Sequence, residues 1–133
     1  MVMSSLVTLQ NIDNVLTFLT LFSSQNCQLY DIQTEPLTLD PYCYSKEFNR
    51  FITALYAGNF VISFDWTNWQ DEANRFVTNP ELLNLADIST IQKLLTSHVR
   101  KERFCSGHLA QMIDNGHLLT ILQRLQAIRI SSY

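Results

Sequence analysis

Side chains able to bind or react are concentrated in one stretch of this chain, residues 99–125. Five charged or imidazole side chains gather there around a short Cys-Ser-Gly turn, namely Arg100, Lys101, Glu102, Arg103 and His108. Arg100 and Arg103 are three residues apart, so on a helix they share a face. Gly107 and His108 follow at the expected start of the next helix, where free backbone amides favour an anion. Two guanidinium groups beside such a helix start would suit a phosphate or a carboxylate.

The same pattern also has a purely structural interpretation. Arg100 and Arg103 fall at the expected C-terminal end of a helix, where cations offset the negative end of the helix dipole. Arg103 could instead pair with an internal carboxylate and hold the bend between two helices. At the level of the sequence both interpretations stay open. The direction of the Arg103 side chain, towards a cleft or towards an acid such as Asp65 or Glu72, would decide between them.

A second candidate ligand site is the segment Asp65-Trp66-Thr67-Asn68-Trp69. Asp65 is typical of a helix N-cap, and the spacing of Trp66 and Trp69 would present both rings on one side of the helix. These rings could form a platform for a ligand, with Asp65 as a base or as the counter-charge of Arg103. The alternative is a capped helix whose two rings belong to the core.

The remaining reactive side chains give weaker signals. His98, His108 and His117 are spaced by ten and nine residues, which matches no zinc-binding helix motif, so no metal is expected. Cys105 lies near a positive charge and a helix start, which favour a reactive thiolate, but its neighbour Phe104 equally favours burial. The chain has no phosphate-binding loop, no nucleophile elbow and no paired-acid motif, so no cofactor and no catalytic residue are predicted.

Composition narrows the class of protein. The chain has 133 residues, 47% of them hydrophobic, and a formal net charge of −3, which disfavours bulk nucleic-acid binding. Its three widely spaced cysteines, Cys27, Cys43 and Cys105, predict no disulfide framework and favour a reducing, cytoplasmic setting. Polar side chains interrupt the first 22 residues, so neither a signal peptide nor a membrane partner is expected.

Apolar periodicity and the low content of glycine and proline predict an all-α fold, a bundle of about six helices joined by short loops. A single domain over residues 1–133 is expected. The helices are predicted near residues 5–23, 45–57, 65–77, 87–99, 107–115 and 117–128. Ser45 and Asp87 are the expected N-caps of the second and fourth helices.

Two short segments depart from the helical pattern. Residues 59–64 alternate in a way that favours an extended segment, without an obvious partner strand, and a second extended piece is expected around residues 29–32. Gly58 lies where a left-handed backbone would end the second helix.

Several of these segments together have the pattern of a known family. They are Pro41-Tyr42, Tyr44-Ser45, Phe64-Asp65-Trp66 with Trp69, Leu94-Leu95-Thr96, Arg100 with Arg103-Phe104 and Gly107, and Gly116 with Leu118, Leu122 and Arg124-Leu125. Over residues 41–125 the chain resembles a family of small bacterial proteins known only as a domain of unknown function. The resemblance implies a small, soluble bacterial protein and no particular activity. Members carry Glu where this chain has Ser106, so an acid that could serve acid–base catalysis at the turn is missing here.

Three functions follow as hypotheses. We expect a non-enzymatic helical module that binds a protein partner or a small anionic ligand at Arg100, Arg103 and Gly107, because catalytic motifs are absent. The first alternative is an enzyme for a phosphate-bearing or nucleotide substrate, with the arginines as electrostatic clamps and Asp65 or His108 as acid–base groups. The second is a nucleic-acid accessory protein with a helix-turn-helix. The apolar stripes of the first and last helices are also compatible with a homodimer.

Overall fold

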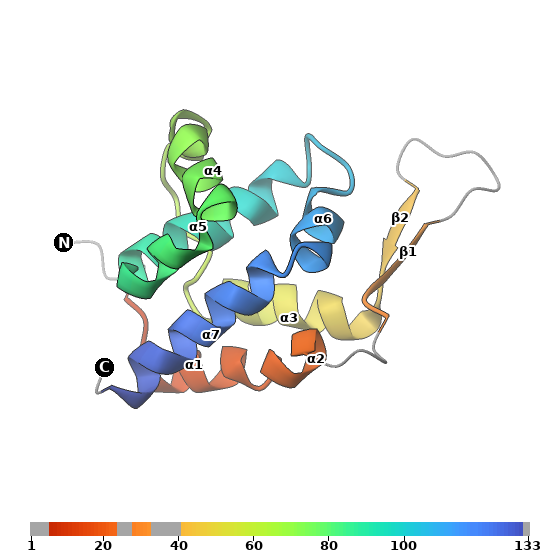
Figure 1. Cartoon of the computed structure of the whole chain (residues 1–133). Helices are drawn as coiled ribbons and strands as arrows, with labels where there is room; N and C mark the ends of the chain where they lie inside the picture. Colours follow the sequence, from red (N-terminus) through yellow and green to blue (C-terminus); the bar gives the residue numbers. More distant parts are fainter. Residues whose placement is uncertain (1–5, 24–27, 33–40, 132–133) are drawn as a thin grey trace.

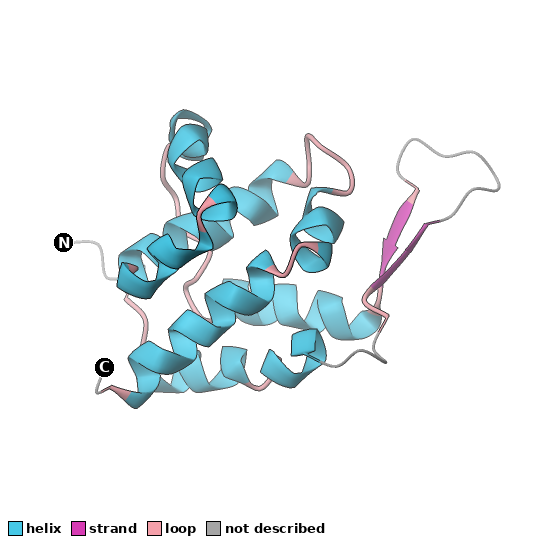
Figure 2. Ribbon diagram, viewed as in Figure 1, coloured by secondary structure: helices cyan, strands magenta, loops and turns pink. Residues whose placement is uncertain are grey.

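The computed structural model describes residues 6–23, 28–32 and 41–131. Within these ranges helices dominate, which confirms the all-α prediction (Figures 1 and 2). In chain order the α-helices, strands and 3-10 helices (η) are α1 (Leu9–Leu16), α2 (Leu19–Ser23), β1 (Tyr30–Ile32), β2 (Tyr42–Tyr44), α3 (Lys46–Ala57), η2 (Trp66–Trp69), α4 (Gln70–Thr78), η3 (Pro80–Leu85), α5 (Ile88–Lys101), α6 (His108–Asp114) and α7 (His117–Ile130). None of the helices in the described ranges combines the length and apolar character needed to cross a membrane.

Helix α7 runs through the middle of the molecule and packs against α1, α2, α6 and η3 (Figure 1). Its buried apolar side chains recur at helical spacing and enter the core: Leu118, Ile121, Leu122 and Leu125. Near its end Arg129 forms an ion pair with Asp13 of α1, with 2.9 Å between Nε and Oδ1. Much of the apolar surface of the first and last helices is therefore covered within the chain itself, while Leu6, Leu9 and Ile130 stay exposed.

The helix predicted over residues 5–23 is two helices in the described part of that range. The Thr17 hydroxyl donates to the carbonyl of Asn14 at 2.7 Å, and the Phe18 amide bonds to Val15 three residues back rather than four. Such bonding tightens and bends a helix. The bend between α1 and α2 brings the Phe18 ring to 5.7 Å from the ring of Phe51 on α3. The packing of Phe18 against α3 thus accompanies a bend where the continuous apolar stripe predicted one straight helix.

The segment 59–64 is a loop and forms no strand, which agrees with the lack of an obvious partner strand for it in the sequence. Polar side chains of α5 bind its backbone instead: Gln92 donates to the Asn59 carbonyl at 2.8 Å, and the Thr96 hydroxyl accepts from the Ile62 amide at 2.9 Å. Asn59, with φ of 65°, adopts the left-handed conformation that was expected at Gly58, and the Phe60 amide closes the turn onto Leu55. The loop is therefore held tightly against α5.

The second expected extended piece does form a strand. β1 pairs antiparallel with β2, with Tyr30 opposite Tyr44 and Ile32 opposite Tyr42. This hairpin stands beside α6, at the opposite end of the molecule from α4 (Figure 2). The N-caps at Ser45 and Asp87 are confirmed, because each side chain accepts a hydrogen bond from the backbone amide three residues on.

Candidate functional site

The predicted arginine pair lines a hollow of about 400 Å³ beside the C-terminal end of α5. We call it the arginine hollow; it is formed by Ile62, Phe64, Trp66, Arg100, Arg103 and Phe104, with Ser63 and Thr67 at its edge. The loop that α5 holds through Gln92 and Thr96 supplies one wall, and the last turn of α5 supplies the other. Arg100 and Arg103 of the first candidate site therefore share one hollow with Trp66 of the second.

Both guanidinium groups of the arginine hollow are without an ion pair in the part of the chain that the structure describes. The two acids that could have clamped Arg103 are bonded elsewhere. The carboxylate of Asp65 accepts from the side chains of Thr67, at 2.9 Å, and of Asn68, and these bonds lower the pKa of Asp65. Glu72 pairs with Arg75 at 3.2 Å. Arg103 is exposed, so its positive charge faces solvent.

The aromatic component of the arginine hollow differs from the expected pair of tryptophans. The ring of Trp66 lies against the ring of Phe104, with 5.8 Å between the centroids and 34° between the planes, and Phe104 is 77% exposed. Trp69 packs instead against Phe64 and Phe76. The platform of Trp66 and Trp69 is not formed. Positions three apart lie on the same side of the 3-10 helix η2, but each ring packs against different partners, Trp66 on Phe104 and Trp69 on Phe64 and Phe76.

The backbone amides at the start of α6 are not free, so this part of the predicted anion pocket is wrong. The carboxylate of Glu102 accepts from the Gly107 amide at 3.0 Å and from the Leu109 amide at 2.8 Å. It also accepts from the hydroxyl of Tyr44 at 2.9 Å. A helix start attracts an anion, and here the chain supplies its own from the preceding turn.

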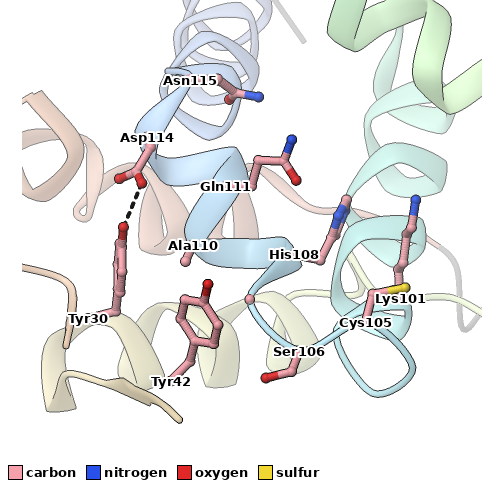
Figure 3. A pocket seen from close by; sticks show the side chains of 11 residues that line it. Tyr30, Tyr42, Lys101, Cys105, Ser106, His108, Ala110, Gln111, Asp114 and Asn115 are labelled. Atoms are coloured by element: carbon pink, nitrogen blue, oxygen red, sulfur yellow. Dashed lines mark hydrogen bonds between the residues drawn. The ribbon is translucent and has the colours of Figure 1, made fainter. Parts of the chain in front are cut away.

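Gly107 and His108 face a different hollow from the arginines. This second hollow, about 700 Å³, lies between the β1–β2 hairpin and α6 (Figure 3). We call it the tyrosine cavity, since Tyr30 and Tyr42 form its hairpin side. Gly107 has φ of +88°, and a Cβ there would lie 2.5 Å from ring atoms of Tyr42. A glycine is needed at this position both for its backbone conformation and for the close approach of the ring.

The three histidines are distant in the sequence but form one buried cluster. Nδ1 of His98 and Nε2 of His108 are 2.9 Å apart and share a hydrogen bond, and the ring centroids of His98 and His117 are 4.9 Å apart. Nε2 of His98 and both ring nitrogens of His117 are buried without a hydrogen-bond partner in the described structure. His117, although it follows directly after a turn glycine, is thus an interior residue.

The environment of this cluster keeps the imidazoles neutral. Burial lowers the pKa of His117 to about 4. Burial, reinforced by Lys101 and then by His117, lowers the pKa of His108 to about 4. The pKa of His98 falls well below its ordinary value, chiefly through burial and then through its two histidine neighbours. Neutral imidazoles in a buried cluster stabilise the fold only while they stay uncharged.

The positions of the histidines, acids and cysteines bear on metal binding and on thiol chemistry. Within the described ranges, no three histidine, cysteine or acidic side chains are arranged to hold a metal ion. Cys43 and Cys105 are exposed free thiols, and Cys27 lies outside the described residues. Cys105 lines the tyrosine cavity, and Nε2 of the neighbouring His108 is bonded to His98 rather than to the Cys105 thiol.

The two alternative functions each depend on where particular side chains lie. The predicted enzyme would place Asp65 or His108 beside Arg100 and Arg103; His108 lines the other hollow, and the carboxylate of Asp65 is bonded to Thr67 and Asn68. A recognition helix formed by α6 would need side chains free to read bases. His108 is only 9% exposed, and the carboxylate of Asp114 accepts a hydrogen bond from Tyr30.

Two long-range side-chain contacts around α6 were not found by sequence reasoning. Tyr44 and Glu102 are 58 residues apart, and Tyr30 and Asp114 are 84 apart. No periodicity links positions so distant, because their contact depends on how the hairpin docks onto α6. One signal in the sequence pointed to such a contact. Glu102 is the single acid among three cations, which suggests that its carboxylate has a specific partner.

A comparison with known protein families covers nearly all of the chain. A single family model matches residues 7–131 and so includes both hollows and the histidine cluster. The chain belongs to a family of unknown function, DUF6508. The match to DUF6508 confirms the resemblance predicted from the sequence and extends it from residues 41–125 to nearly the full chain. No curated protein and no solved structure matches the chain.

Proposed function

We propose that this protein is a non-enzymatic binding module that holds an acidic segment of a partner protein in the arginine hollow. The observation that carries the proposal is the pair of unpaired guanidinium groups, Arg100 and Arg103, beside the exposed ring of Phe104. On a chain with a formal net charge of −3, such a concentration of free positive charge is unusual. It has a direct use in recognising carboxylates, because guanidinium groups bind them through two parallel hydrogen bonds.

The aromatic component favours a protein segment over a simple inorganic anion. Phe104 and Trp66 present apolar surface between the two charges, and this surface would gain stability only from a ligand that also has an apolar side chain. Tryptophan and arginine are the side chains most often responsible for binding energy at protein interfaces. An acidic segment with one apolar anchor would satisfy both components.

The setting of the protein and its assembly are further parts of this proposal. A reducing bacterial cytoplasm agrees with the two exposed thiols, Cys43 and Cys105, which would be prone to oxidation elsewhere. A homodimer would use the exposed apolar side chains Leu6, Leu9 and Ile130 near the ends of α1 and α7. Neither proposal is needed for the binding function itself.

The binding function can be tested by selecting peptides from a random phage-displayed library against the purified protein. We expect the selected peptides to be enriched in aspartate and glutamate around one apolar residue. Their binding should fall roughly tenfold in Arg103→Ala, since a central guanidinium contributes at least this much to an interface. Arg50→Ala is the matched control, because Arg50 is an exposed arginine on α3 outside the hollow.

Two results would overturn the proposal. One is selection of peptides without acidic enrichment. The other is binding that Arg103→Ala and Arg50→Ala weaken equally, since a general charge effect would then explain it. If instead the arginine hollow binds free nucleotides and no peptide, the small-ligand alternative replaces the protein partner.

A further inference from the structure

The tyrosine cavity is separate from the arginine hollow and has a different chemical character. It is bounded by the hairpin on one side and by α6 and the preceding turn on the other (Figure 3). Its volume of about 700 Å³ lies within the range of cavities that hold small molecules. The proposed binding of an acidic segment in the arginine hollow does not use it.

The hairpin side of the tyrosine cavity is aromatic and fixed in place. The rings of Tyr30 and Tyr42 are 5.9 Å apart between centroids and tilted by 45°. Tyr42 is held by its close packing on Gly107. The hydroxyl of Tyr30 donates to Oδ2 of Asp114 at 2.5 Å, across the cavity (Figure 3). The tilt leaves no parallel slot into which a flat base could slide between the two rings.

The α6 side of the tyrosine cavity is polar. Asp114 and Asn115 follow Gln111 by three and four residues, at the end of α6, and all three line the cavity. The amide of Gln111 is exposed and forms no side-chain hydrogen bond within the described structure. Amides both donate and accept, and a carboxylate accepts up to four hydrogen bonds. This side therefore offers a dense, mixed set of hydrogen-bonding groups.

The charges in the tyrosine cavity balance. Lys101 contributes one positive charge and Asp114 one negative charge, and His108 is neutral near pH 7 because burial lowers its pKa to about 4. A phosphate or another strong anion would find a single cation here and an acid nearby. A neutral ligand with many hydroxyl groups would fit better, since each hydroxyl also both donates and accepts. Its C–H edges would pack on the negative faces of the tyrosine rings.

We infer that the tyrosine cavity is a binding site for a neutral polyhydroxylated ring. Tyr30 and Tyr42 contact the C–H face of the ring, and Gln111, Asp114 and Asn115 bind its hydroxyl groups. Such a ring occurs in a free saccharide and in the ribose of a nucleoside, and the cavity recognises the chemistry that the two share. This site is independent of the arginine hollow, so either one can fail without the other.

The inference is testable by saturation-transfer NMR with the full-length protein and a panel of millimolar probes: the common hexoses and pentoses, their disaccharides, adenosine and uridine. We expect saturation to pass to ring C–H protons of at least one probe. In Gln111→Leu the signal should fall several-fold. Gln123→Leu is the control, because Gln123 is an exposed glutamine on α7 outside the cavity.

Each outcome of this experiment has a defined meaning. Transfer to a saccharide that is lost in Gln111→Leu supports the site and identifies a free sugar as its ligand. Transfer only to ribose protons of a nucleoside supports it with the nucleoside as source. Transfer only to base protons, transfer unchanged in Gln111→Leu, or no transfer to any probe overturns the inference.

Discussion

Tyr44 of the hairpin donates a hydrogen bond to the carboxylate of Glu102, with 2.9 Å between Oη and Oε1. The same hydroxyl accepts from the Ala110 amide at 3.1 Å, while Glu102 accepts from the amides of Gly107 and Leu109. This pair therefore connects the hairpin, the turn after α5 and the start of α6. It also occupies the helix start with an internal anion, and so leaves Arg100 and Arg103 as the free positive charges of this region.

Removal of the Glu102 carboxylate should destabilise the protein. In Glu102→Ala the amides of Gly107 and Leu109 and the hydroxyl of Tyr44 lose their acceptor in a partly buried place. We expect a loss of about 2–3 kcal/mol in the free energy of unfolding, measured by urea denaturation. Glu81→Ala, at an exposed acid whose side chain forms no hydrogen bond within the described residues, should change it by less than about 0.5 kcal/mol. Equal effects of the two substitutions would contradict the role assigned to Glu102.

The two left-handed glycines should respond differently to alanine. Gly107 and Gly116 have φ of +88° and +78°, but a Cβ meets Tyr42 only at Gly107 and has open space at Gly116. Gly116→Ala should cost about 1 kcal/mol for the backbone alone. Gly107→Ala should cost about 1–3 kcal/mol more through overpacking. The double substitution Gly107→Ala with Tyr42→Ala should recover part of that excess, and strict additivity of the two costs would disprove the contact.

The histidine cluster should make the fold sensitive to mild acid. In the folded state the pKa of His108 and of His117 is about 4, below the unfolded value of about 6.5. Between about pH 4 and pH 6.5 the unfolded chain therefore binds more protons than the folded protein. The free energy of unfolding consequently falls as the pH drops from about 6.5 to about 4. The loss should approach about 3 kcal/mol for each of the two histidines. Urea denaturation across this range measures it, and a flat profile between pH 7 and pH 5 would be the contrary result.

The contact between Tyr30 and Asp114 should be visible in a titration of the tyrosines. The carboxylate of Asp114 holds the proton on the Tyr30 hydroxyl and raises its pKa to about 12. Asp114→Asn removes the negative charge, so the pKa of Tyr30 should move back towards about 10. Stability that this bond provides is present below about pH 10 and is lost as the pH rises through 12. Ultraviolet absorbance of tyrosinate in both proteins gives the comparison, and identical curves would rule the contact out.

Helices whose signals are local were predictable from the sequence. Ser45 and Asp87 cap α3 and α5 as their side chains and positions predict, because a cap depends on residues only three positions apart. The break at Thr17 and the loop at residues 59–64 were not, since Phe18 beside the break packs on Phe51 of α3, and Thr96 of α5 binds the backbone of the loop. The intrinsic propensity of a segment determines whether it forms a helix only where tertiary packing does not favour another conformation.

The candidate site was predictable to the same extent. Helical spacing placed Arg100 and Arg103 on one face, and the Cys-Ser-Gly turn made Gly107 and His108 neighbours, but Trp66 belonged to a separate candidate segment that the structure joins to the arginines. The separation of these two groups into different hollows was not, because it depends on the direction in which the turn after α5 leaves the helix. The carboxylate of Glu102 sets that direction by bonding to the start of α6.

The binding function depends most directly on the two free guanidinium groups. The decisive measurement is isothermal titration of a selected acidic peptide into the wild type, into Arg100→Ala with Arg103→Ala, and into Arg50→Ala. Our account predicts micromolar binding by the wild type and by Arg50→Ala, and a loss of roughly a hundredfold in the double variant, equivalent to about 2.7 kcal/mol. Unchanged affinity in the double variant would contradict it.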